Sequence, residues 1–175
     1  FKLWHGIEPF IDDEIIKQKI TRKELLVIEN DQIVDAENFA AHIALTKAIK
    51  NYKLNKLITF HSRIKGAKHF ADNFVNIFRS IPEFNSIDSE ITCDHISGNM
   101  PAAERNRKLR SLKEIKSNEI KIITNSKCLS EGVDVPTLSG IAFIDPKYSQ
   151  IDIVQSVGRA IRKSDDKSIG CLLYT

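Results

Sequence analysis

The sequence predicts an α/β fold, with helices on both faces of a mainly parallel sheet in a three-layer α/β/α arrangement. Short β-rich runs alternate with longer segments of helical periodicity, and short loops separate them. Two of the runs, 120–123 and 141–144, are almost entirely apolar, which is typical of strands covered on both faces. The chain has 175 residues, enough for one domain with an appendage and a buried core.

Residues 1–55 lack this regular alternation and are predicted to form an N-terminal extension or inter-domain connector. The pattern changes near residues 51 to 56, which marks the expected boundary with the core domain. Residues 1–22 are expected to be irregular. The expected elements are an amphipathic stretch around 11–20, a strand over 25–29, a hairpin partner at 33–34 and a helix over 35–50.

Residues 56–175 are predicted to form the core domain. The segment after the first strand carries Ala67, Phe70 and Phe74 on one helical face. Pro101 marks the start of the next helix, because proline fits the first helical turn. The expected strands cover 56–60, 91–96, 120–124, 140–144 and 169–174, and the expected helices cover 64–78, 102–115 and about 151–162.

The composition is ordinary for a globular protein, with 42% hydrophobic and 28% charged residues. A net charge of +3 permits nucleic-acid binding but does not by itself argue for it. Cys93, Cys128 and Cys171 are widely spaced and odd in number, so they predict neither a disulfide framework nor a metal site. They indicate a reducing, cytoplasmic location. No run approaches the ~18 apolar residues of a membrane span. The chain starts at Phe1 without a signal peptide, so it is expected to be a piece of a longer protein.

Polar or glycine-bearing loops follow four of the predicted strands. In parallel α/β sheets, ligands bind in the loops at the carboxyl ends of the strands. Each feature also has a simpler explanation: Ser62 and Ser97 as helix N-caps, and Gly98 and Gly132 as turn residues. Their joint occurrence along one edge favours a functional interpretation. The four loops contain His61-Ser62-Arg63, Ser97–Met100, Thr124–Pro136 and Asp145-Pro146.

The last predicted helix carries three long polar side chains on one stripe. Gln155, Arg159 and Arg162 lie at i, i+4 and i+7, while apolar residues cover most of the remaining surface. Two arginines on a largely buried helix require an anionic partner, and Asp152 cannot neutralise both. Arginine forks suit phosphate, which favours a phosphate-bearing ligand. Salt bridges to carboxylates elsewhere in the fold, or contact with bulk water, are the alternative.

Together these segments resemble the C-terminal RecA-like domain of superfamily 2 helicases and translocases, over residues from about 55 to 175. The forms of the last two motifs are most similar to restriction-enzyme-type and related bacterial DEAD/DEAH-like helicases. The matching segments are Leu57–Arg63 for motif IV, His95–Met100 with Glu104-Arg105 for the HGxM…ER stretch, Thr124–Pro136 for motif V and Gln155–Arg162 for motif VI.

The resemblance implies that ATP with Mg²⁺ lies between two RecA-like domains and is bound mainly by an N-terminal domain of the same polypeptide. In such motors the second domain supplies arginines to the γ-phosphate, a contribution of about 10³–10⁵ in rate. By position, Arg162 is the expected arginine finger and Arg159 its partner. Gln155 would orient the nucleotide or the attacking water. Asp134 would accept a hydrogen bond from the ribose or bind across the cleft, and Gly132 would allow close approach of the backbone.

The same resemblance implies a track for the sugar–phosphate backbone of a nucleic acid, with DNA favoured over RNA. Contacts of this kind are independent of base sequence and sensitive to salt. The residues expected to line the track are Ser62, Arg63, Gly98, Thr124 and Asn125.

Two positions depart from the family pattern. Ile96 and Ser97 separate His95 from Gly98, and Glu131 stands where some relatives carry arginine. The chain also lacks a G-x-x-x-x-G-K-[ST] loop and an Asp-Glu-x-x box, so it contains half of the expected active site. The chain alone is therefore predicted not to hydrolyse ATP.

Two other classes of protein compete with the motor domain. A non-catalytic nucleic-acid-binding or scaffolding domain could keep the fold, but it would have no need for the phosphate-seeking Arg159 and Arg162. An unrelated doubly wound enzyme would need a glycine-rich phosphate loop after its first strand, and residues 61–66 are a poor match for one.

Overall fold

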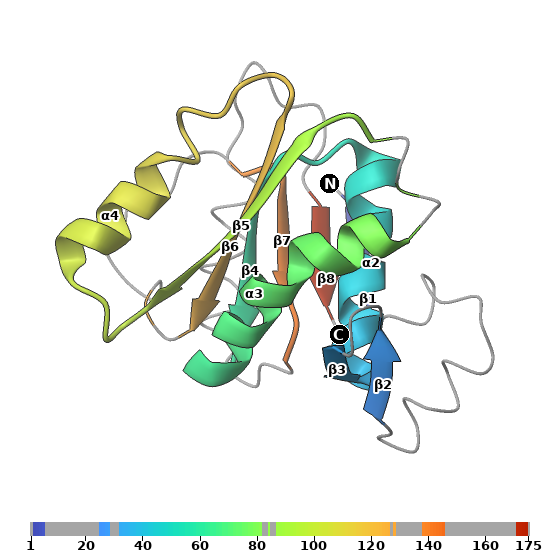
Figure 1. The fold of residues 1–175 in the computed structure, drawn as a ribbon. Helices are drawn as coiled ribbons and strands as arrows, with labels where there is room; N and C mark the ends of the chain where they lie inside the picture. The colour runs from blue at the N-terminus through green and yellow to red at the C-terminus, as the bar shows by residue number, and fades with distance from the viewer. Residues whose placement is uncertain are drawn as a thin grey trace.

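Among the residues that the structure describes, the main sheet contains six strands in the order β1-β8-β7-β4-β6-β5, and each neighbouring pair is parallel (Figure 1). This confirms the predicted α/β fold with a parallel sheet. The strands are β1 (Lys2–His5), β4 (Lys56–His61), β5 (Glu90–Ser97), β6 (Glu119–Ser126), β7 (Gly140–Phe143) and β8 (Cys171–Tyr174). The computed structural model describes residues 2–5, 25–28, 32–81, 84, 87–126, 128, 138–145 and 171–174.

The N-terminal region contains a hairpin and a long helix. Strands β2 (Leu25–Ile28) and β3 (Gln32–Asp35) pair in antiparallel fashion and form a separate two-stranded sheet. Helix α2 (Ala36–Tyr52) follows directly. It ends at Lys53, whose φ of 51° is the left-handed conformation that often closes a helix. The backbone N–H of Leu54 then donates to the carbonyl of Ile49.

Helices α2 and α3 (Ile64–Ser80) cover one face of the sheet (Figure 1). Phenylalanines at helical spacing on α3 form a row with ring centroids about 6 Å apart, which Phe84 continues. They pack against sheet residues such as Leu57 and Ile122, and α2 adds Leu45 and Ile49 to the same core. Burial of these aromatic and aliphatic side chains stabilises the packing on this face.

Helix α4 (Ala102–Arg110) belongs to the opposite face. Leu109, and Leu112 in the turn after the helix, pack with Ile58, Ile96 and Phe143 in a second core cluster. Strand residues of alternate parity supply the two clusters, because successive side chains of a strand point to opposite faces. Both faces are therefore apolar, as the all-apolar strands predicted.

Two details differ from the sequence-based expectations. Strand β1 lies in a region expected to be irregular, and it pairs with β8 at the far end of the chain. Helix α4 ends at Arg110 rather than near Ile115, because the chain turns at Ser111 and the 111–113 stretch bonds in a tighter pattern. Helix α2 also packs in the core of this sheet. The expected stretch around 11–20 and the helix over 151–162 lie outside the described residues.

Candidate functional site

The carboxyl ends of β4, β5 and β6 meet at one edge of the sheet. Their last residues, His61, Ser97 and Ser126, stand side by side in register across the three strands. The loops that carry Ser62, Arg63 and Gly98 therefore begin at the same edge. These three predicted residues therefore lie at the same edge as the end of β6, which carries Thr124 and Asn125.

Ser62 and Arg63 are exposed at the end of β4. The backbone N–H of Ser62 donates to Asp145 Oδ2 over 2.6 Å, and its hydroxyl donates to the same oxygen over 3.0 Å. Such charge-assisted bonds are among the stronger ones in proteins. Ser62 is not the N-cap of α3, because Arg63 occupies that position without a side-chain capping bond. Asp145 therefore joins the loop after β4 to the segment after β7.

Gly98 lies in an exposed turn directly after β5. The backbone N–H of Met100 donates to the carbonyl of Ser97 over 3.2 Å, which closes the turn. Ser97 is buried and does not cap α4, because Pro101 holds that position. The turn leaves the backbone around Gly98 accessible for a close approach by a ligand.

Thr124 and Asn125 are buried, and both side chains bond within the fold. The Thr124 hydroxyl donates to the carbonyl of Ala67 over 2.9 Å, which ties β6 to α3. Asn125 Oδ1 accepts from the backbone N–H of Cys128 at 3.3 Å and from its thiol at 2.7 Å. In this arrangement the two side chains position the end of β6 rather than face solvent.

Two histidines lie beneath α3 at this edge. His61 is 4% exposed and packs on Phe70, and its Nε2 lies 2.9 Å from Thr59 Oγ1. Burial lowers the pKa of His61 to about 4, although Asp145 acts in the opposite direction. Burial also lowers the pKa of His95, and Lys108 adds to that effect. Both rings are therefore neutral near pH 7.

The described cysteines are unsuited to nucleophilic chemistry. Burial raises the pKa of Cys128 to about 11, and burial raises that of Cys93 as well. Both thiols are thus protonated at neutral pH, whereas a reactive cysteine needs its thiolate. Within the described ranges, no three His, Cys, Asp or Glu side chains are grouped so that they could hold a metal ion. None of the described helices has the length and hydrophobicity of a membrane span.

The remaining predicted site residues lie outside the described residues. These are the two arginines Arg159 and Arg162, together with Gln155, Gly132 and Asp134. Their roles at a nucleotide stay predictions. Strand β7 ends at Phe143, and the segment that leads toward Gln155 begins after it, at the same edge as the loops described above.

The sequence did not predict the bonding state of two residues at this edge. Asp145 is recognisable from the sequence only as the residue after a strand, yet it accepts both bonds from Ser62. Ser126 is fully buried at the end of β6, and its hydroxyl has no partner among the described residues. The available signal was position, because both residues stand at the carboxyl ends of strands.

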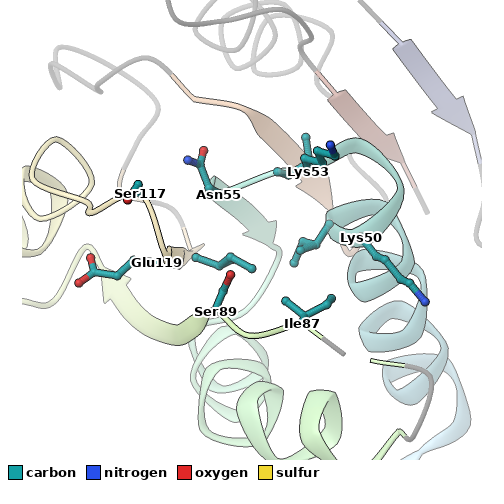
Figure 2. A pocket seen from close by; sticks show the side chains of 10 residues that line it. Lys50, Lys53, Asn55, Ile87, Ser89, Ser117 and Glu119 are labelled. Atoms are coloured by element: carbon teal, nitrogen blue, oxygen red, sulfur yellow. The ribbon is translucent and has the colours of Figure 1, made fainter. Parts of the chain in front are cut away.

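A cavity of about 270 Å³ lies at the opposite edge of the sheet, where β4, β5 and β6 begin. Its apolar floor includes Ile49, Leu54 and Ile120. Figure 2 shows Lys50 extending away from this cavity, and its ammonium lies 5.5 Å from the ring centre of Phe84. The cavity is therefore separate from the loops at the carboxyl edge.

Comparison with known proteins shows the family of the chain and relatives that share its fold. A family model described as "Helicase conserved C-terminal domain" matches residues 40–164. A protein of Sulfolobus islandicus filamentous virus (isolate Iceland/Hveragerdi), named "Putative helicase 22", is 25% identical over 160 residues. The match covers 89% of this chain and 28% of the viral protein, so the chain spans little more than a quarter of that relative.

Solved structures share the fold. The ATP-dependent Type ISP restriction-modification enzyme LlaBIII, bound to DNA, matches with a TM-score of 0.71 and 24% identity, over 90% of this chain and 11% of LlaBIII. Domain 2 of the DEAD-box helicase Mss116p, bound to an RNA duplex, matches with a TM-score of 0.57 and 19% identity, over 79% of this chain and 49% of that one. At these identities the likeness concerns the RecA-like fold.

Proposed function

This chain belongs to the family of helicase conserved C-terminal domains, and on that premise we propose that it is the second motor domain of an ATP-dependent nucleic-acid translocase or helicase. The observation that carries the proposal is the family match itself. It spans the loops of the described carboxyl edge and also the Gln155–Arg162 segment. The complete motor requires a separate N-terminal RecA-like domain, because the chain has no P-loop sequence.

In this proposal, the carboxyl edge grips the sugar–phosphate backbone. Ser62, Arg63 and the turn at Gly98 are exposed there and offer hydroxyl, guanidinium and backbone donors. Thr124 and Asn125 support them from below by fixing the end of β6. The nearby histidines add no charge, because both are neutral near pH 7. DNA is the favoured partner, and LlaBIII, the structural relative with the TM-score of 0.71, is bound to DNA.

At the nucleotide, we assign Arg162 the role of arginine finger and Arg159 that of its partner at the γ-phosphate. Gln155 orients the nucleotide or the water, while Gly132 and Asp134 approach the ribose side. We assign Mg²⁺ and most of the ATP contacts to the N-terminal domain, as the resemblance to two-domain motors implies. Bound ATP would supply the free energy of phosphoryl transfer, and the arginines would stabilise charge on the transferred group.

The test is ATP hydrolysis by the polypeptide that carries both motor domains, with double-stranded DNA, single-stranded DNA or RNA. Arg162→Ala should lower nucleic-acid-stimulated turnover by about 10³-fold or more, because an arginine finger contributes about 10³–10⁵. Lys163→Ala, one residue further along, removes the same charge and should leave turnover nearly unchanged. Near-normal turnover of Arg162→Ala, or no turnover with any nucleic acid, would favour a non-catalytic scaffold. The chain alone should not hydrolyse ATP.

A further inference from the structure

One short segment accounts for the net positive charge of the chain. Residues 102–116, which comprise α4 and the turns after it, contain six cations and two carboxylates, a net charge of +4. The entire chain has a net charge of +3, so the remaining 160 residues are together slightly acidic. A segment of this kind is the electrostatic footprint of a polyanion-binding surface.

Helix α4 divides its charged side chains between two sides. Arg105, Lys108, Leu109 and Leu112 follow the i, i+3, i+4, i+7 spacing of one stripe, which faces the sheet. On that stripe Lys108 Nζ lies 3.1 Å from Asp94 Oδ1 and donates to the carbonyl of His95 over 3.2 Å. Arg105 donates to the carbonyl of Met100. Lys108 therefore ties α4 to β5, and Arg105 bonds to the turn that precedes the helix.

The outward side of the same segment carries Arg107, Arg110 and Lys113, all exposed. The side chains of Arg107 and Arg110 have no hydrogen-bond or ion-pair partner among the residues that the structure describes. Their spacing of three residues keeps them on one side of the helix, and the backbone N–H of Lys113 donates to the carbonyl of Arg110, which continues the turn. The three side chains span ~9 Å of helix, at 1.5 Å per residue. That length matches two to three phosphates of one DNA strand, spaced by ~3.4 Å.

The position of this surface favours nucleic acid as its occupant. Strand β5 is the outermost strand of the sheet, and α4 stands beside it at the margin of the molecule (Figure 1). Helix α4 begins a few residues after Gly98, and Arg107 lies ~8 Å along the helix from that start, at 1.5 Å per residue. We propose that Arg107, Arg110 and Lys113 form a second phosphate-binding surface that holds the nucleic acid beyond the ATP-driven track. The inference rests on the proposed function and extends the same binding path.

The test uses binding of a short DNA duplex, measured by fluorescence anisotropy between about 50 and 200 mM salt. The triple variant Arg107→Gln, Arg110→Gln, Lys113→Gln should bind at least tenfold more weakly at the lower salt concentration. Its slope of log K against log salt should be smaller by about 2, because each lost phosphate contact removes about 0.9. The matched control replaces Lys47, Lys50 and Lys53 by glutamine. These have the same spacing but belong to α2 and its end, on the other face of the sheet, and this control should leave the slope unchanged.

Three outcomes would overturn the inference. Equal slopes for the triple variant and the unchanged protein would show that α4 does not contact phosphate. Equal losses in the α4 and α2 variants would indicate a nonspecific charge effect. Polyglutamate binding as tightly as DNA, and weakened in the same way by the α4 substitutions, would assign the surface to an acidic protein. In each case, intact DNA-stimulated ATPase that depends on Arg162 would leave the proposed function standing.

Discussion

The helices on the two faces of the sheet differ in how much of their surface they bury. On one face, α3 buries seven residues along 17 positions, including three phenylalanines, and α2 packs beside it. On the other face, α4 has nine residues and buries only Leu109, while its remaining surface is largely charged. A long amphipathic helix gains its stability from packing, whereas a short basic one contributes little to the core. The buried side chains of α3 therefore stabilise the fold, whereas the exposed charged side chains of α4 are available for binding.

The largest expected effect is on the α3 face. Phe74→Ala removes a ring that is fully buried between Phe70 and Phe78, and it should lower the free energy of unfolding by about 4 kcal/mol. Leu109→Ala on α4 should cost about 2–3 kcal/mol, because a smaller side chain is lost. Urea titrations of both variants measure the difference. A larger loss of unfolding free energy for Leu109→Ala than for Phe74→Ala would mean that the α4 face, rather than the α3 face, contributes more to stability.

The next largest expected effect is a loss of stability at acid pH, caused by His61 on the α3 face. The pKa of His61 is about 4 in the folded chain, against 6.5 for an unperturbed histidine, so the unfolded chain binds more protons between these values. The contribution of His61 is therefore fully present above pH 6.5 and is lost as the pH falls toward 4, by up to roughly 3 kcal/mol.

His95 acts in the same direction, since burial lowers its pKa too. His61→Gln keeps a polar side chain near Thr59 but cannot titrate, so its free energy of unfolding should fall less steeply between pH 6.5 and 4. The control is His69→Gln, an exposed position on α3. Parallel pH profiles for His61→Gln and the unchanged chain would refute this role of His61.

The smallest effect distinguishes the two sides of α4. Lys108→Gln breaks the contact with Asp94 and weakens the bond to the His95 carbonyl, which should cost about 0.5–1 kcal/mol, since the pair is partly exposed. Arg107→Gln on the outward side should change stability by less than about 0.5 kcal/mol. Thermal unfolding of both variants tests this order. Equal losses would mean that Arg107 also has a structural partner.

Much of the fold can be predicted from local patterns. Residues 120–123 and 141–144 are recognisable as strands because both faces of a buried parallel strand are apolar. The α3 helix is recognisable because its phenylalanines recur at helical spacing. Strand β1 is different: Lys2–His5 carry no clear alternation, and pairing with β8 is a tertiary contact that no local pattern reports.

The candidate site is predictable in location but not in the state of each side chain. Ser62, Arg63 and Gly98 are expected at the carboxyl edge, and they are exposed there. Thr124 and Asn125 share that edge, but their side chains already bond within the fold. The Thr124 hydroxyl donates to the carbonyl of Ala67, and the Asn125 side-chain oxygen accepts from the backbone N–H of Cys128. Local sequence does not reveal which polar residue finds an internal partner, because those partners come from distant segments or from backbone geometry. For the same reason Asp145 could not be paired with Ser62 in advance.

The pairing of β1 with β8 also sets the order of events during synthesis. Leu3 pairs with Leu172, so the two strands are separated by nearly the whole chain. At about 5–20 residues per second, β1 leaves the ribosome on the order of ten seconds before β8 exists. Strand β8 also lies between β7 and β1, so it must be added to the sheet before β1 can join. Among the strands of this sheet that the structure describes, the first to be made is thus the last to be placed.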